Sequence, residues 1–345
     1  MNFPPRVSLT VTNNCNLRCR MCGQWSETGY MRTPAPARPA MTLDDWKRVV
    51  DEMAANQVTW ALVRGGEPFL LPGIIDLLAY MRSKGLNTSV DTNGTMLKQY
   101  AADLVRIGGL HMTISVDGPE EIHDAVRGVK GTFRRIEEGL AALREAERAT
   151  GGHVALSICF TISPYSYRGL GEMADVARRL GIPEILIVPY YYYPESTGRQ
   201  YEEELRALGC GGPGTMACPS YSWRGFHHEE SGVDFDEFLI QLRRFKASLG
   251  SLKLFPYMDF SEEDYRTWFA DATTPVGSSE CWMTTGMADI QPSGDVNFCV
   301  DTPDYSVGNL KESTLAELWN GERAERFREY RRSKPLAVCH RCGAK

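Results

Sequence analysis

Short apolar runs alternate with longer amphipathic stretches from residue 6 to residue 190 of the chain. The runs are rich in Val, Ile, Leu and Thr and have the length of β-strands. The predicted strands cover residues 6–11, 59–65, 87–93, 111–117, 153–162 and 184–190. The stretches between them repeat apolar residues at helical spacing, and glycines follow several of them, as at helix C-termini. The first predicted helix begins after Thr42, which has Asp45 in a capping-box position. Further predicted helices cover 73–84, 96–107, 132–149 and 168–180.

Strand and helix alternate six times, which predicts an α/β fold with a parallel sheet and helices outside it. Six such units close only part of an eight-unit barrel, so we expect a partial (β/α)6 TIM-like barrel. In such a scaffold the site residues belong at the C-terminal ends of the strands. The distinctive segments of the chain follow the first four predicted strands: 15–22, 65–68, 92–94 and 115–118. This coincidence predicts an active site at that end of the sheet.

The pattern changes after residue 194, where the regular alternation stops. The elements expected beyond it are helices over 200–208 and 234–248, a short strand over 252–257, a hairpin over 287–300 with a turn at 292–294, and a helix at about 313–331. We therefore divide the chain into a barrel over 1–194, a linker and cap region over 195–275, and a smaller α+β domain over 276–345.

Composition and charge narrow the functional class. The 345 residues carry a formal net charge of −6, which argues against a nucleic-acid partner, because phosphate binding needs a basic face. No segment has the pattern of a secretory signal or a membrane span, so we expect a cytoplasmic protein with no membrane partner. Thiols stay reduced in that compartment, and the ten cysteines are therefore expected to bind metal or take part in catalysis.

Three cysteines, Cys15, Cys19 and Cys22, follow the first predicted strand. Three thiolates leave one coordination position of a metal centre open for chemistry. Their spacing resembles that of the radical S-adenosylmethionine (SAM) superfamily. The resemblance implies a 4Fe–4S cluster on the three thiolates, with SAM bound to the fourth iron as the source of a 5′-deoxyadenosyl radical. Met21 stands where many members have an aromatic residue, and a methionine can still pack against adenine.

Other strand-end segments resemble the SAM contacts of this superfamily. The implied contacts are Gly65, Gly66, Glu67 and Pro68 of a GGEP motif, with Asn93, Ser115, Asp117, Arg127 and Thr161. In the family, the GGEP segment holds the methionine ammonium and the arginine reaches the carboxylate. The alternative explanations, which are less favoured, are turn formation for Asp117 and a surface ion pair for Arg127.

A second cysteine pattern occupies the C-terminal region, with Cys281, Cys299, Cys339 and Cys342, and with Gly294 five residues before the second of them. It resembles the opening of the SPASM domain. Four thiolates imply one auxiliary 4Fe–4S cluster with all ligands supplied by protein, the shortened twitch arrangement of aminocyclitol dehydrogenase-like members. A four-cysteine zinc ribbon would also suit a hairpin and a CxxC pair.

Three further cysteines are candidates for a catalytic hydrogen-atom donor. Cys159 falls on the small, polar face of the fifth predicted strand, which should point into the barrel. Cys210 and Cys218 lie in a glycine-rich loop. A free cysteine is most often a small buried apolar residue, and this explanation is favoured for Cys159. The tyrosines at 190–193 are expected either to bind a polar substrate or to pack beneath the cap.

The expected function is radical hydrogen abstraction from a small polar substrate, such as a sugar, aminocyclitol or nucleoside of a natural-product pathway. Oxidation of an alcohol to a ketone is the leading hypothesis, because a fully ligated second cluster can accept the electron that the substrate radical loses. The alternatives are a radical epimerase with a cysteine hydrogen donor, a peptide maturase, and a non-catalytic metal-binding protein. Such an enzyme also needs a low-potential electron donor of the flavodoxin or ferredoxin type.

Overall fold

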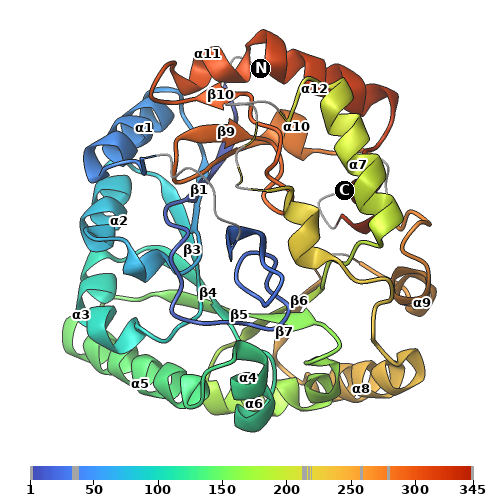
Figure 1. Cartoon of the computed structure of the whole chain (residues 1–345). Coiled ribbons are helices and arrows are strands. Elements are labelled where there is room, and N and C mark those ends of the chain that lie inside the picture. Colours follow the sequence, from blue (N-terminus) through green and yellow to red (C-terminus); the bar gives the residue numbers. More distant parts are fainter. Residues whose placement is uncertain are drawn as a thin grey trace.

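A computed structural model describes residues 3–32, 39–211, 216, 218, 220–256, 259–277 and 280–342. Its described residues form one curved, mixed sheet in the strand order β10-β9-β8-β1-β2-β3-β4-β5-β6-β7. Figure 1 shows the sheet as an open arc with a ring of helices outside it, and a loop of the N-terminal region lies in front of the strand ends. The fold is therefore α/β with a partial barrel that does not close.

All six predicted strands are confirmed to within two residues. They are β1 (Arg6–Thr10), β2 (Trp60–Arg64), β3 (Asn87–Thr92), β4 (Leu110–Ser115), β5 (Ala155–Ile162) and β6 (Glu184–Pro189), each parallel to its neighbours. A seventh strand, β7 (Lys253–Pro256), pairs with β6 in parallel. It lies within the predicted strand over 252–257, whose last residue is outside the described ones. The region over 195–275 thus contributes a strand to the sheet.

The outer helices follow the predicted pattern closely. They are α1 (Leu43–Ala55), α2 (Ile74–Ser83), α3 (Leu97–Ile107), α4 (Glu120–Arg127), α5 (Thr132–Thr150), α6 (Met173–Leu180), α7 (Glu195–Ala207), α8 (Phe235–Ser248) and α9 (Glu262–Ala270). The Thr42–Asp45 capping box is present at the start of α1. Short 3₁₀ turns supplement them: η1 (Tyr30–Arg32), η2 (Pro68–Leu70), η3 (Tyr167–Glu172) and η4 (Ser222–Phe226).

Sequence reasoning missed α4 and α9 and merged two C-terminal helices into one. The predicted helix over 313–331 is interrupted: α11 (Leu315–Trp319) ends before Gly321, which caps α12 (Glu322–Ser333) in an extended conformation. Glycine carries a large conformational entropy cost within a helix, and an Asn-Gly pair favours such a break. Both α4 and α9 are short, at 8 and 9 residues, and offer few turns over which a helical repeat can be recognised.

The C-terminal region continues the barrel sheet. After α10 (Met283–Gly286), β8 (Met287–Ile290) pairs in parallel with β1. β9 (Asp295–Asn297) and β10 (Gly308–Asn309) then add antiparallel strands, which confirms the predicted hairpin. The last turn, η5 (Ala337–Arg341), carries one of the C-terminal cysteines. This pairing fixes the C-terminal region beside the ends of the barrel strands.

The two faces of β5 show how the sheet positions functional groups. Ile158, Phe160 and Ile162 are fully buried among the outer helices. Cys159 and Thr161, which alternate with them, face the inner cavity. The predicted assignment of the two faces is therefore confirmed. In the part of the chain that the structure describes, no helix is long and apolar enough to cross a membrane.

Candidate functional site

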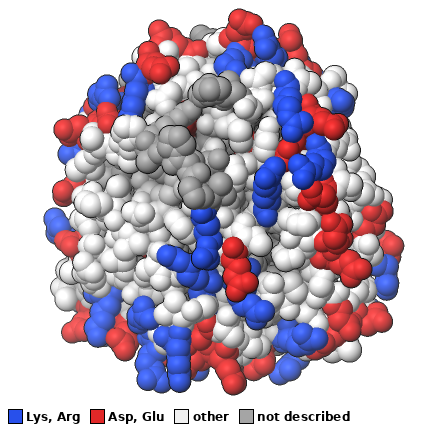
Figure 2. All heavy atoms as spheres, viewed as in Figure 1, with Lys and Arg blue, Asp and Glu red and all other residues white. Residues whose placement is uncertain are grey.

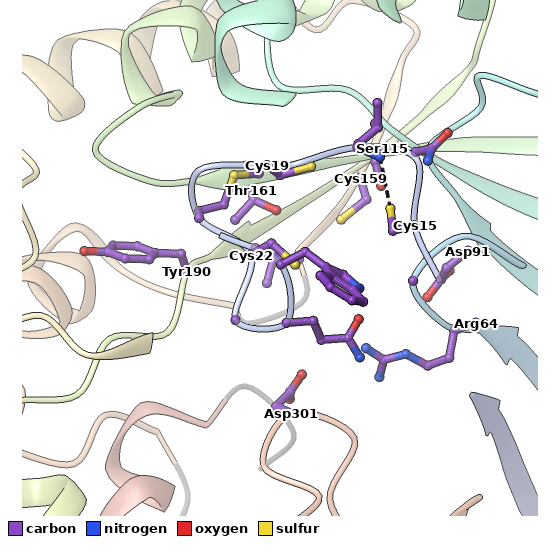
Figure 3. A pocket seen from close by; sticks show the side chains of 18 of the residues that line it. Cys15, Cys19, Cys22, Arg64, Asp91, Ser115, Cys159, Thr161, Tyr190 and Asp301 are labelled. Atoms are coloured by element: carbon purple, nitrogen blue, oxygen red, sulfur yellow. Dashed lines mark hydrogen bonds between the residues drawn. The ribbon is translucent and has the colours of Figure 1, made fainter. Parts of the chain in front are cut away.

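A cavity of about 360 Å³ lies at the C-terminal ends of the barrel strands. Cys15, Cys19 and Cys22 line one side of it, and residues of β2 to β6 line the other. Figure 3 shows the cysteine loop, with Cys159 and Thr161 of β5 beyond it. Parallel strands bring their C-terminal ends to one edge, which explains why segments far apart in sequence meet here.

The cysteine loop is held by hydrogen bonds to neighbouring elements. The Arg18 and Arg20 amides donate to the carbonyls of Arg127 and Val126, at 3.3 and 2.9 Å, at the end of α4. The Trp25 indole N–H donates to the Asn13 carbonyl at 2.6 Å. These contacts hold the loop against the end of α4 and the segment that follows β1.

The three thiols suit a cluster with one open iron. They come from a single loop and face a cavity whose far side is free for a second ligand. Burial raises the pKa of all three thiols, that of Cys22 to about 11. Metal ligation requires thiolates, so cluster binding must release protons here. The Arg127 guanidinium lies 3.7 Å from the Cys19 sulfur, where its positive charge favours the thiolate.

Only the two glycines of the GGEP segment reach the cavity. A Cβ at Gly66 would lie 2.3 Å from the Asn14 carbonyl oxygen, and one at Gly65 would lie 2.4 Å from that of Thr12. Glycine is therefore required where this turn packs against the cysteine loop. Pro68 lies behind the cavity, at the start of η2.

Glu67 is fully buried in the wall behind the cavity. Its carboxylate accepts hydrogen bonds from the Thr92 hydroxyl and the Asn93 amide, both at 2.8 Å, and from the Phe69 amide at 3.2 Å. Burial raises its pKa to about 7. Glu67 thus joins the ends of β2 and β3 and orients Asn93, which lines the cavity. Direct contact of Glu67 with SAM stays a prediction.

Arg127 and Asp117 form a buried ion pair, with Nε 2.6 Å from a carboxylate oxygen. The pair is not at the surface, since the two side chains are 9% and 0% exposed. Arg127 lines the cavity, whereas Asp117 lies behind it and also accepts from the Thr161 amide at 3.4 Å. The arrangement leaves Arg127 aimed at the cysteine loop and Asp117 as the group that holds it.

Cys159 is the one predicted hydrogen donor that lines the barrel cavity. It pairs in register with Ser115 of β4, which also lines the cavity. Burial, then the negative charges of Asp91 and Asp117, raises the pKa of the Cys159 thiol to about 12, so it keeps its hydrogen at neutral pH.

Cys210 and Cys218 do not line the barrel cavity. The Cys210 thiol donates to the Asp304 carbonyl at 3.5 Å, next to the C-terminal region. Asp304 also raises the pKa of the Cys218 thiol, although burial is the larger cause. Both cysteines therefore lie toward the C-terminal region.

Sequence reasoning did not single out Arg64 and Asp301, which also line the cavity. In Figure 3 the Arg64 side chain extends into the cavity, with Asp91 and Asp301 on either side. Burial works to lower the Arg64 pKa, but the charges of Asp289, Asp301 and Asp91 raise it. The sequence does place Arg64 at the end of β2, directly before the glycine pair, and this position could have identified it as a cavity residue. Tyr190 and Tyr191 line the same cavity.

A second, smaller cavity of about 40 Å³ is lined by Cys281, Cys299, Cys339 and Cys342. These cysteines come from the segments before α10, after β9 and within or just after η5, and they converge on one enclosed space. Such a set suits a metal group whose ligands all come from protein. The four predicted ligands are thus brought together.

Neighbouring polar groups position this second set. The Thr302 amide donates to the Cys299 sulfur at 3.3 Å. The Glu204 carboxylate of α7 accepts from the Ala337 amide at 2.8 Å, at the first residue of η5, which carries Cys339. Sequence reasoning missed Glu204 because no local pattern shows that a side chain of α7 will accept a hydrogen bond from the distant turn η5.

The two cavities are adjacent. Val300 and Asp301, which directly follow Cys299, line both of them. Arg64 of the barrel donates to the Val300 carbonyl at 3.4 Å. A group bound at the barrel strand ends therefore lies next to the four-cysteine site.

The exposed side of the cysteine loop is basic. Arg18 and Arg20 are exposed, and their guanidinium groups lie over the rings of Trp25 and Tyr165, at 5.0 and 4.1 Å. Figure 2, in the same view as Figure 1, shows basic side chains near the middle of this face and acidic ones mainly around its edge. The chain as a whole is acidic, so this basic surface stands out from it.

Comparison with known families gives two matches. Residues 9–160 match the radical SAM superfamily, and residues 281–343 match SPASM, an iron–sulfur cluster-binding domain. The first match contains the cysteine loop and the GGEP segment, and the second contains all four C-terminal cysteines. These domains imply 4Fe–4S clusters and SAM as cofactors, and the second match favours a cluster over zinc at the four-cysteine site.

Individual relatives cover nearly the whole chain. An AdoMet-dependent heme synthase of Methanosarcina barkeri is 24% identical, over 99% of this chain and 88% of the relative. A pre-heme d1 synthase of Dinoroseobacter shibae is 26% identical, over 99% and 78%.

The structure of Streptococcus suis SuiB bound to S-adenosylmethionine shares the fold. It has a TM-score of 0.63 at 15% identity and covers 99% of this chain and 72% of that one. SuiB has also been solved bound to the precursor peptide SuiA.

The two cysteine sets, the glycine pair beside the first set and both family matches agree. The chain contains a radical SAM domain over residues 9–160 and a SPASM iron–sulfur cluster-binding domain over residues 281–343.

Proposed function

We propose that this enzyme dehydrogenates a small polar substrate, oxidising an alcohol carbon to a ketone and passing the electron to the four-cysteine site. Cys15, Cys19 and Cys22 would hold the cluster that binds SAM, and this group would supply the radical chemistry that removes one hydrogen atom from the substrate. The oxidation also releases one proton and one electron. The observation that carries the proposal is that Val300 and Asp301 line both cavities, so the electron has a short path.

The cavity lining favours a polar substrate. Arg64, Asp91 and Tyr191, which are not among the predicted SAM contacts, provide charged and hydroxyl groups at the strand ends. Such groups bind hydroxyl- or amine-bearing molecules and would leave buried polar atoms unpaired against an apolar substrate. Asp91 and Asp301 are carboxylates in this cavity that can accept the released proton.

A second candidate, radical epimerisation, is favoured by Cys159. Its thiol lines the cavity and stays protonated at neutral pH, so it can return a hydrogen atom to a substrate carbon. Cys210 and Cys218 lie outside this cavity, which makes Cys159 the first donor to test.

One experiment separates these functions. The anaerobically reconstituted enzyme is incubated in D₂O with reductant, SAM and a panel of aminoglycoside and nucleoside intermediates, a porphyrin and short peptides. The porphyrin and the peptides cover the substrates suggested by the names of the heme synthases and by SuiB with its precursor peptide. Formation of 5′-deoxyadenosine and the substrate mass are then measured.

Loss of two mass units with stoichiometric 5′-deoxyadenosine supports dehydrogenation. A gain of one mass unit, lost in Cys159→Ala, supports epimerisation. Turnover of only the porphyrin or the peptides overturns the small-substrate proposal.

The basic face of the cysteine loop supports an acidic electron donor of the flavodoxin or ferredoxin type. Charge complementarity raises association rates and makes them salt-dependent. We expect Arg20→Glu to slow SAM cleavage driven by flavodoxin while leaving cleavage driven by dithionite unchanged. Arg148→Glu, an exposed change at the end of α5 outside this loop, is the matched control. Equal slowing with both reductants would instead mean a structural effect.

A further inference from the structure

Two cysteines of the four-cysteine site are followed three residues later by a threonine. The pairs are Cys281 with Thr284 and Cys299 with Thr302, and both threonines are buried. A threonine hydroxyl at this spacing can reach either the sulfur or the backbone carbonyl of the cysteine. Which of the two atoms it contacts decides whether it acts on the metal ligand itself.

The Thr302 hydroxyl contacts the Cys299 sulfur. Its Oγ1 lies 3.1 Å from Sγ, and the Thr302 amide donates to the same sulfur at 3.3 Å. As a metal ligand, Cys299 would be a thiolate, which has no proton to give, so the hydroxyl must be the donor. One ligand sulfur of the four-cysteine site therefore accepts two hydrogen bonds from a single residue.

The Thr284 hydroxyl instead donates to the Cys281 carbonyl, at 3.0 Å. Thr284 lies in α10, and a threonine hydroxyl within a helix commonly bonds a carbonyl of the preceding turn. Thr302 lies outside any helix and precedes Pro303, and a residue before proline is disfavoured in the helical conformation. The two threonines thus share one spacing but contact different atoms, because only one of them lies in a helix.

Neighbouring groups hold Thr302 in this position. Thr302 is 6% exposed, and its carbonyl accepts from the Tyr201 hydroxyl at 3.5 Å. Two residues further on, the Asp304 carboxylate accepts from the Ser222 amide and hydroxyl at 2.8 and 2.6 Å. The hydroxyl is therefore enclosed together with the sulfur, and low-dielectric surroundings strengthen a hydrogen bond to a charged atom.

The short segment that Thr302 closes lies between the two sites. Cys299 and Thr302 line the four-cysteine cavity. Val300 and Asp301, the two residues after Cys299, line both cavities. The hydrogen-bonded sulfur therefore belongs to a ligand whose own segment reaches the barrel cavity.

We propose that Thr302 raises the reduction potential of the auxiliary cluster through the hydrogen bond from its hydroxyl to Cys299. Reduction adds one negative charge, which is shared with the ligand sulfurs, and a hydrogen-bond donor at a sulfur stabilises that charge. This positioning role rests on the proposed dehydrogenase function, in which the four-cysteine site receives the electron.

The test is a potentiometric titration of the reconstituted holoenzyme, followed by electron paramagnetic resonance, without substrate. Thr302→Val keeps the shape of the side chain and the backbone hydrogen bond but removes the hydroxyl. It is expected to lower the equilibrium constant for auxiliary-cluster reduction about tenfold, or 59 mV for a one-electron couple. Thr302→Ser keeps the hydroxyl and should titrate close to the wild type. Thr284→Val is the matched control, because it removes a buried hydroxyl that bonds a carbonyl rather than a sulfur.

Iron content and spectra verify that each variant retains its clusters. Should Thr302→Val fail to load, Thr302→Ala provides a second side chain without a hydroxyl. An unchanged potential in a loaded variant without the hydroxyl, or an equal shift in Thr302→Ser or Thr284→Val, overturns the proposed role of Thr302 and leaves the dehydrogenase proposal standing. A wild-type auxiliary cluster that cannot be reduced would overturn both proposals.

Discussion

The two cysteine sites of this protein are built in opposite ways. The three-cysteine site comes from one loop of eight residues, Cys15 to Cys22, and opens onto a large cavity. The four-cysteine site gathers its ligands from three distant segments around a small enclosed space. An open site can bind and activate a substrate, whereas an enclosed one is suited to electron transfer.

The charged side chains near the two sites are also placed differently. Arg127 lines the open site and is neutralised by Asp117, so it can bind a ligand carboxylate without adding net charge. Arg341 is next to Cys342 in the sequence but does not line the enclosed site, and its guanidinium donates to the Thr274 and Thr267 carbonyls. The open site therefore has a charged group suited to binding, whereas Arg341 has a structural contact outside the enclosed site.

Removing each set of ligands tests the comparison most strongly. Cys15→Ala, Cys19→Ala and Cys22→Ala combined should reduce 5′-deoxyadenosine formation at least about a hundredfold, which is about 2.7 kcal/mol in the barrier. Cys281→Ala with Cys339→Ala should leave SAM cleavage measurable while abolishing the oxidised product. Both products are measured by mass spectrometry. An equal loss of SAM cleavage in both variants would show that the two sites do not have separate roles.

Breaking the buried ion pair at the open site should have the next largest effect. Asp117→Asn leaves Arg127 as an unpaired buried charge, which typically costs about 3–5 kcal/mol of unfolding free energy. Denaturant unfolding of the anaerobic holoprotein measures this loss. Glu137→Gln removes the partner of the largely exposed Arg179 and should cost at most about 1 kcal/mol. Similar costs for the two variants would contradict the assignment of Arg127 and Asp117 as a buried pair.

Loss of the Glu204 hydrogen bond at the start of η5 should reduce cluster binding only at the four-cysteine site. Glu204→Gln weakens the hydrogen bond to the Ala337 amide, with an expected cost of about 1–3 kcal/mol. Auxiliary iron should be lost first, since η5 carries Cys339, and iron analysis with electron paramagnetic resonance follows this. The neighbouring exposed Glu203→Gln is the control. Preferential loss of the three-cysteine cluster would contradict this positioning role.

The smallest expected effect is a pH dependence of the unfolding free energy, caused by Glu67 beside the open site. Burial raises the pKa of Glu67 to about 7 from its ordinary value of 4.5. A raised folded-state pKa means that the stability from this group is fully present below pH 4.5 and is lost as the pH rises through 7. Between pH 6 and 8 the wild type should therefore lose about 1 kcal/mol more than Glu67→Gln. Parallel pH profiles of unfolding free energy for the two proteins would rule this out.

Most of the sheet and both cysteine sets could be predicted from the sequence, because strand length, apolar periodicity and cysteine spacing are local signals. The pairing of β8 with β1 could not, since no local pattern reports which strand a distant hairpin joins. Arg64 and Asp301 were missed for a related reason: a lone charged residue gains meaning only when folding brings it to a cavity. Glu67 was recognised as part of a motif, but the sequence did not reveal its burial behind the cavity wall.

The pairing of β1 with β8 also orders the assembly of the protein during synthesis. β1 leaves the ribosome well before β8, and at ordinary translation rates the stretch between the two strands takes on the order of tens of seconds to synthesise. Throughout that interval one edge of β1 presents unpaired backbone groups, and such edges are prone to pair wrongly with other chains. The strand directly before the first cysteine loop thus becomes fully enclosed only when the C-terminal region arrives.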